Sequence, residues 1–102
     1  MRTIEGLYDS KQIEHFCRRW SVVQLSLFGS VTRDDFLPES DVDVLVRFAP
    51  GRTLTLDSYT TMREELSALF AGREIDLVEE GRLADPYRRY EILRTREVIY
   101  GR

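Results

Sequence analysis

Apolar residues recur along this chain with two different periods, and the first of them is helical. Ile13, Phe16, Cys17 and Trp20 follow an i, i+3, i+4, i+7 course after Ser10, the expected N-cap. Polar and charged residues fill the positions between them. This spacing predicts an amphipathic helix that packs one stripe of side chains inward.

The helical period returns from Leu56 to Phe70, and Gly72 is well placed to end that helix in a left-handed conformation. Tyr59 and Met62 lie on the apolar stripe. Both could line a base pocket, but an aromatic residue and a methionine at helical spacing usually belong to the core. We therefore expect a second core helix here.

The second period is the two-residue alternation of a strand, and it occurs in residues 22–28, 41–46 and 73–80. In the first of these segments, Val23, Leu25 and Leu27 are expected to share one face. The chain from 25 to 48 then follows the order strand, tight turn, short helix, loop, strand. These segments are therefore read as strands that alternate with helices along the chain.

The second predicted strand carries two acids on an otherwise apolar segment. Asp41 and Asp43 would lie on one face, with Cα atoms roughly 6.5 Å apart, and valines would occupy the other face. Two ionised carboxylates at that distance repel each other unless a hard cation such as Mg²⁺ bridges them. Asp76, on the third strand, adds a further acid. Alone it would indicate a solvated edge strand, but beside the acid pair it is a candidate for function.

Gly29 and Ser30 end the first strand with the features of a phosphate site. Glycine permits a sharp turn without a Cβ in the way of a ligand, and the amides that follow would open a helix N-terminus, which attracts phosphate. Phosphate next to a magnesium site indicates a nucleotide.

Length and composition limit the remaining possibilities. A chain of 102 residues buries about two-thirds of its unfolded surface, enough for one modest core, so we expect a single domain over 1–102. The net charge of −3 gives no general reason to bind nucleic acid. Cys17 and His15 are too few ligands for a zinc site. We expect Cys17 to be a small buried hydrophobic residue and His15 to lie at the surface or at the edge of the core. Without a signal peptide or an apolar run of about 20 residues, the cytoplasm is the expected location and no membrane contact is expected.

The last part of the chain, from residue 82 on, is basic. Asp85 and Pro86 have the form of an N-cap followed by proline at the first helical position, which predicts a helix through roughly Arg94. The apolar residues 98–100 are expected to dock on the body. Residues 82–102 hold six arginines against three acids, a net charge of +3, whereas the rest carries −6. We expect a solvated arginine face, with an acidic partner or a phosphate chain as the alternative.

The order Gly29-Ser30, ten residues, Asp41-x-Asp43 resembles the signature of the polymerase-β-like nucleotidyltransferases, and the short chain looks like their minimal nucleotidyltransferase (MNT) branch. Asp76 matches the third acid of that family by its strand pattern. Arg33 matches an arginine that family members often carry after Gly-Ser. The residue that follows it, Asp34, stands where those members have glycine.

The resemblance implies an α/β fold of the α+β type, a small mixed β-sheet with helices chiefly on one face. It also implies that an acceptor hydroxyl attacks the α-phosphate of ATP and that pyrophosphate leaves. The acids would be catalytic and would hold two Mg²⁺ ions, and a second group would hold the nucleotide. The implied catalytic and metal-binding residues are Asp41, Asp43 and Asp76, and the implied nucleotide-binding residues are Gly29, Ser30 and Arg33.

A chain of this size has no room for an acceptor-binding domain, so a partner is expected to supply the acceptor. Minimal nucleotidyltransferases resemble antitoxins whose partner is a HEPN toxin, and the class adenylylates a tyrosine of that toxin. The resemblance thus implies an AMP-transferring antitoxin in a hetero-oligomer with its toxin. Two alternatives are an antitoxin that acts by binding alone and a catalytic subunit that modifies a small, aminoglycoside-like alcohol.

Overall fold

A computed structural model describes residues 4–32, 37 and 39–101. Within them the regular elements alternate along the chain, as the two periods predict. In chain order they are η1 (Ile4–Leu7), α1 (Ser10–Trp20), β1 (Val22–Phe28), η2 (Gly29–Thr32), β2 (Val42–Phe48), α2 (Leu56–Leu69), β3 (Ile75–Glu79), η3 (Glu80–Arg82), α3 (Pro86–Thr95) and β4 (Glu97–Tyr100), where η denotes a short 3-10 helix.

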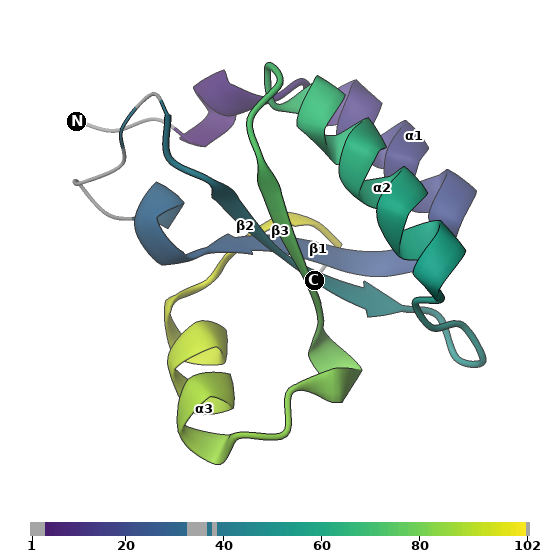
Figure 1. The fold of residues 1–102 in the computed structure, drawn as a ribbon, viewed down its shortest axis with the longest axis vertical. Coiled ribbons are helices and arrows are strands. Elements are labelled where there is room, and N and C mark those ends of the chain that lie inside the picture. Colours follow the sequence, from purple (N-terminus) through teal and green to yellow (C-terminus); the bar gives the residue numbers. More distant parts are fainter. Residues whose placement is uncertain (1–3, 33–36, 38, 102) are drawn as a thin grey trace.

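The strands form one mixed sheet in the order β3-β2-β1-β4 (Figure 1). β1 pairs antiparallel with both β2 and β4, whereas β2 and β3 run parallel. A parallel pair needs a long crossover connection, and α2 supplies it. The apolar tail expected to dock on the body therefore does so as β4, an edge strand on β1.

Helices cover both faces of this sheet unequally. α1 and α2 lie side by side on one face, and α3 lies on the other (Figure 1). The larger core lies under α1 and α2 and includes Ile13, Leu25 and Met62, whereas a smaller cluster of Phe28, Leu45 and Ile92 lies under α3. The predicted mixed sheet with helices chiefly on one face is confirmed.

Two local predictions need correction. The register between β1 and β2 shifts between Val22 and Gln24, which is a β-bulge. Because of the bulge, Val22 packs into the larger core and Val23 is exposed, although the alternation predicts Val23 inside. The N-cap of α1 is Asp9 rather than Ser10, and its carboxylate accepts the backbone N–H groups of Lys11 and Gln12.

The end of α2 also differs by one residue from the expectation. Its C-cap is Phe70, so the first residue beyond the cap is Ala71, with a φ of 60°. Gly72 follows with a φ of 82°, and its N–H donates to the carbonyl of Ser67. The chain thus takes two left-handed residues to turn into β3, and glycine occupies the second of them.

Candidate functional site

Two of the predicted acids are neighbours in the sheet. Asp43 on β2 is in register with Asp76 on β3, and parallel strands lie about 4.8 Å apart. Both residues alternate with side chains of the larger core, so they belong to the face that α3 covers. Asp43 is half-buried and Asp76 is exposed. The tertiary fold therefore brings together two carboxylates that are 33 positions apart in the sequence.

Asp41 is the remaining predicted acid, and it precedes the first residue of β2. The N–H of Val42 donates to the carbonyl of Glu74, which continues the pairing with the chain before β3. Asp41 is exposed at this end of the sheet. The sequence places it inside the strand, whereas the structure places it on the segment that leads into the strand, next to the rim of the site.

Gly29 lies directly against Asp43. Phe28, the last residue of β1, is in register with Asp43, and the chain turns away at Gly29 with a φ of +73°. A Cβ on Gly29 would stand 2.1 Å from Oδ2 of Asp43, a distance that no real contact allows. The absent side chain therefore makes room for the carboxylate itself, in addition to permitting the left-handed backbone.

The phosphate turn is shorter than predicted. From Gly29 the chain makes a single 3-10 turn, η2, in which the hydroxyl of Thr32 donates to the carbonyl of Gly29 at 2.7 Å. Val31 anchors this turn in the core with no exposed surface. One turn has little macrodipole, so the phosphate-binding groups that it offers are the Ser30 hydroxyl and the local amides. Arg33 and Asp34 lie outside the described residues.

Asp43 and Asp76 fit a divalent cation by their chemistry and placement. They are hard oxygen ligands on adjacent rigid strands, and glycine leaves space beside one of them. Among the described residues, however, no group of three or more His, Cys, Asp and Glu side chains is arranged to hold a metal ion. A cation here would need ligands from the nucleotide or from water besides these carboxylates, which is how Mg²⁺ is usually held next to phosphates.

A polar clamp that the sequence analysis missed holds α3 over the sheet. Arg96, the C-cap of α3, donates from Nη1 to Oε1 of Gln24 at 2.9 Å and to Oε1 of Glu80 at 3.3 Å. Arg89 donates to the carbonyl of Glu80 from the preceding turns of the helix. Gln24 is only 4% exposed. A buried glutamine inside an apolar strand is the one sequence signal that could have revealed this clamp, because such a side chain needs a partner.

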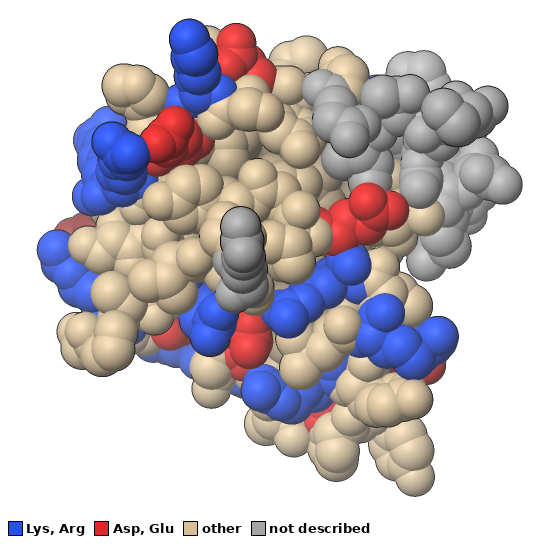
Figure 2. Space-filling view, turned by 180° about the vertical axis from the view of Figure 1, so that it is seen from behind, with Lys and Arg blue, Asp and Glu red and all other residues tan. Residues whose placement is uncertain are grey.

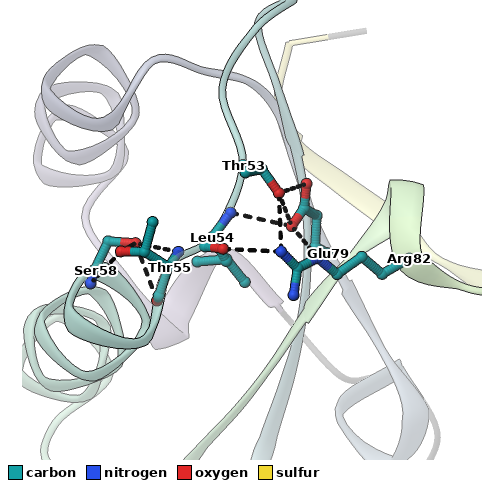
Figure 3. A network of polar contacts seen from close by, with 6 residues as sticks. All are labelled: Thr53, Leu54, Thr55, Ser58, Glu79 and Arg82. Atoms are coloured by element: carbon teal, nitrogen blue, oxygen red, sulfur yellow. Dashed lines mark hydrogen bonds and ion pairs between the residues drawn. The ribbon is translucent and has the colours of Figure 1, made fainter.

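A second network joins the end of β3 to the start of α2 (Figure 3). The carboxylate of Glu79 accepts from the Thr53 hydroxyl at 2.9 Å and from the Leu54 N–H at 3.1 Å, and it pairs with Nε of Arg82 at 3.2 Å. Arg82 also donates to the Leu54 carbonyl at 3.0 Å. These bonds fix the loop after β2 on the side of the molecule away from Gly29, so they support the sheet rather than the site.

Cys17 and His15 lie in the environments that the sequence predicts. Cys17 is fully buried, and burial raises the pKa of its thiol to about 12. His15 is exposed and lines a groove between α1 and α2, on the opposite face of the sheet from the acids. Among the described residues, no helix is both long and apolar enough to cross a membrane.

Comparison with known proteins places this geometry among nucleotidyltransferases. Residues 9–99 match the family model described as nucleotidyltransferase domain. A Methanocaldococcus jannaschii protein named "Putative protein adenylyltransferase MJ0128" is 30% identical over 89 residues, which is 85% of this chain and 88% of that protein. A solved structure described as a "putative minimal nucleotidyltransferase" is 34% identical, with a TM-score of 0.68 and 85% of each chain covered.

Two further solved structures share the fold at lower identity. A toxin–antitoxin structure with AMP-PNP has a TM-score of 0.73 at 20% identity, covering 92% of this chain and 74% of that one. A tri-AMPylated Shewanella oneidensis HEPN toxin in complex with an MNT antitoxin has a TM-score of 0.64 at 19% identity, covering 91% of this chain and 70% of that one.

Proposed function

Because the chain belongs to the nucleotidyltransferase domain family and is a nucleotidyltransferase, we propose that it transfers AMP from ATP to a tyrosine of a HEPN-type toxin, as the antitoxin of the pair. The observation that carries this proposal is that Asp43 is in register with Asp76 and lies directly beside Gly29. It supplies paired carboxylates next to a turn that a phosphate can approach. The proposed functional unit is the one domain, residues 1–102, in a hetero-oligomer with the toxin.

Each proposed site residue has a chemical role. Ser30 and the amides after Gly29 receive the β- and γ-phosphates, and Arg33 steadies the leaving pyrophosphate. Asp41, Asp43 and Asp76 would hold Mg²⁺, which when bound supplies positive charge to the phosphates. Asp76, on the edge strand, accepts the proton of the tyrosine hydroxyl. The tyrosine oxygen then bonds to the α-phosphorus, and the bond from that phosphorus to the bridging oxygen of the β-phosphate breaks.

The solved relatives support the nucleotide and the type of partner. One is a toxin–antitoxin structure with AMP-PNP, and another pairs an MNT antitoxin with a HEPN toxin that carries AMP. A curated relative has the name "Putative protein adenylyltransferase MJ0128". The thiol of Cys17, the one cysteine of the chain, suits a reducing compartment, so we propose that the pair acts in the cytoplasm.

The test separates binding from chemistry at the two in-register acids. Asp43→Asn is expected to abolish AMP transfer to the proposed HEPN-type toxin partner, as followed by intact-mass spectrometry. Asp76→Ala is expected to bind a non-hydrolysable ATP analogue nearly as wild type does but to lose transfer by a factor of at least about 10², as for loss of a general base. Glu64→Gln, an exposed acid on α2, is the control and should keep full transfer. Normal transfer by both aspartate variants would refute the proposal.

One observation favours a second candidate, an antitoxin that acts by binding alone. Among the described residues no three His, Cys, Asp or Glu side chains are arranged to hold a metal ion. This candidate predicts that Asp43→Asn still neutralises the toxin in growing cells while AMP is absent from the toxin. Loss of neutralisation together with an intact complex would exclude it.

A further inference from the structure

The outward side of α3 presents two large aromatic side chains to solvent. Tyr87 is 86% exposed and Tyr90 is 64% exposed. With Arg94 they follow an i, i+3, i+7 spacing, which places all three along one stripe of the helix. We name this stripe, Tyr87, Tyr90 and Arg94, the α3 patch. Tyrosine and arginine are the residue types most enriched among the side chains that dominate binding energy at protein interfaces.

The α3 patch borders a shallow, open hollow on the surface of the same helix. The hollow has a volume of about 540 Å³ and is lined by Pro86, Arg89, Tyr90, Leu93 and Arg94. The guanidinium carbon of Arg94 stands 5.9 Å from the centroid of the Tyr90 ring, and Arg94 pairs with Glu91 at 2.8 Å. These exposed contacts favour an arrangement in which the guanidinium lies beside the ring.

Charge indicates what kind of surface would fit the α3 patch. Helix α3 itself carries three arginines against one glutamate, a net charge of +2, and the pairs that Arg82 and Arg96 form with Glu79 and Glu80 lie outside this helix. From behind, Lys and Arg side chains form an interrupted band across the lower half of the molecule, toward α3 (Figure 2). A compact acidic protein face can meet this local charge, whereas a long nucleic acid would also meet the acidic remainder.

The position of α3 relates the patch to the reaction. α3 covers the same face of the sheet as Asp43 and Asp76, and it packs against η2, which begins at Gly29. A standard interface buries about 800 Å² on each partner, an area about 28 Å across. The whole molecule measures only 39 × 31 × 24 Å. A protein that is seated on α3 with an interface of that size therefore also reaches the neighbourhood of the acids.

We propose that the α3 patch is the surface on which the acceptor protein docks, and that the acceptor places acidic residues opposite the arginines of α3 and packs against the rings of Tyr87 and Tyr90. This inference rests on the proposed function, because it assigns a role to the partner that supplies the tyrosine. In this proposal α3 selects the acceptor, and Gly29 and Ser30 bind the nucleotide.

The test measures affinity for the proposed HEPN-type toxin partner by calorimetry, together with the rate of AMP transfer. The double variant Tyr87→Ala/Tyr90→Ala and the charge reversal Arg94→Glu are each expected to weaken binding at least about tenfold. They should raise KM for the acceptor with little change in kcat, and affinity for a non-hydrolysable ATP analogue should stay at the wild-type value. Tyr87→Phe/Tyr90→Phe should keep binding and transfer, because the rings and not the hydroxyls carry the contact.

Matched controls come from the opposite side of the sheet. Leu56→Ala removes an apolar side chain that is 83% exposed, and Arg18→Glu reverses an arginine that, like Arg94, pairs with a glutamate of its own helix. Both should bind normally. Acceptor affinity of the α3 variants within twofold of wild type, equal losses in the controls, or losses only toward a single-stranded RNA probe would each overturn the inference. If wild type binds through α3 but transfers no AMP, the proposed function fails and the docking surface stands.

Discussion

At the scale of single residues, the site depends on a glycine that leaves space for a carboxylate. Gly29 has no Cβ, and the space where one would stand is taken by the carboxylate of Asp43. The same glycine has a φ of +73°, which an L side chain adopts only with strain. Gly29 therefore meets two separate requirements, one for space and one for backbone conformation. Comparison with a second glycine that meets only the second requirement can distinguish their effects.

Gly29→Ala is expected to displace the Asp43 carboxylate and to abolish AMP transfer, because the new Cβ would meet Oδ2 at 2.1 Å. Gly51→Ala is the matched control: Gly51 has a φ of +86°, but nothing lies within 4 Å of a Cβ placed there. Both variants should lose about 1–2 kcal/mol of stability from backbone strain. Transfer assays and urea unfolding of both proteins check this, and equal loss of activity would show that strain alone matters.

At the scale of elements, α3 is held at its two ends by different means. Asp85 caps its start by accepting the N–H groups of Tyr87 and Arg88, which is a local interaction. Arg96 fixes its end to Gln24 in β1 and to Glu80, which are distant in sequence. Ile92 packs between these ends onto the sheet. The polar clamp thus sets how α3 lies over the face that carries Asp43.

Arg96→Met is expected to cost about 1–3 kcal/mol of unfolding free energy, because it leaves the buried Gln24 side chain without its charged partner. Methionine keeps much of the apolar stem, so packing should change little. The control Arg18→Met removes an exposed arginine that pairs only along its own helix, and such pairs contribute about 0.3–0.5 kcal/mol. Urea denaturation of the three proteins compares these costs, and equal stabilities would show that the clamp contributes nothing.

At the scale of the whole molecule, one side chain reports on the state of the larger core. Cys17 has no exposed surface and lies in the cluster that joins α1 and α2 to the sheet. Burial raises the pKa of its thiol from 9.0 to about 12. Between these two pH values the thiol stays protonated in the native protein, whereas the same thiol ionises in the unfolded chain. The reactivity of this thiol and its effect on stability therefore depend on its burial in the fold and not on the residue type alone.

Native protein is expected to resist iodoacetamide at Cys17 and to react only through unfolding. The folded pKa is raised from 9.0 to about 12, so the stability contribution is complete below pH 9 and is lost as pH rises toward 12. Between about pH 8 and about pH 10.5, wild type should lose about 2 kcal/mol more unfolding free energy than Cys17→Ala, at about 1.4 kcal/mol per pH unit above the unfolded pKa. Parallel pH dependence of the two proteins in urea unfolding would contradict this.

The elements of this protein were predictable because they depend on neighbours in the chain. The alternation in residues 22–28 coincides with β1, and Asp85-Pro86 begins α3 as predicted, since a strand period and a helix cap involve only adjacent residues. The error at Val23 has a cause that lies outside the strand itself. The bulge that exposes Val23 arises from the pairing of two strands, and no single-strand pattern reveals it.

The sequence by itself determined which acids and which glycine are candidates for the site, because spacing and residue type are enough to indicate that chemistry. Only the tertiary structure decided that Asp43 and Asp76 stand in register, that Gly29 makes room for one of them, and that α3 lies on their face of the sheet. The physical reason is that strand order and register come from packing between distant segments. Hydrophobic burial stabilises that packing as a whole, and no local period encodes it.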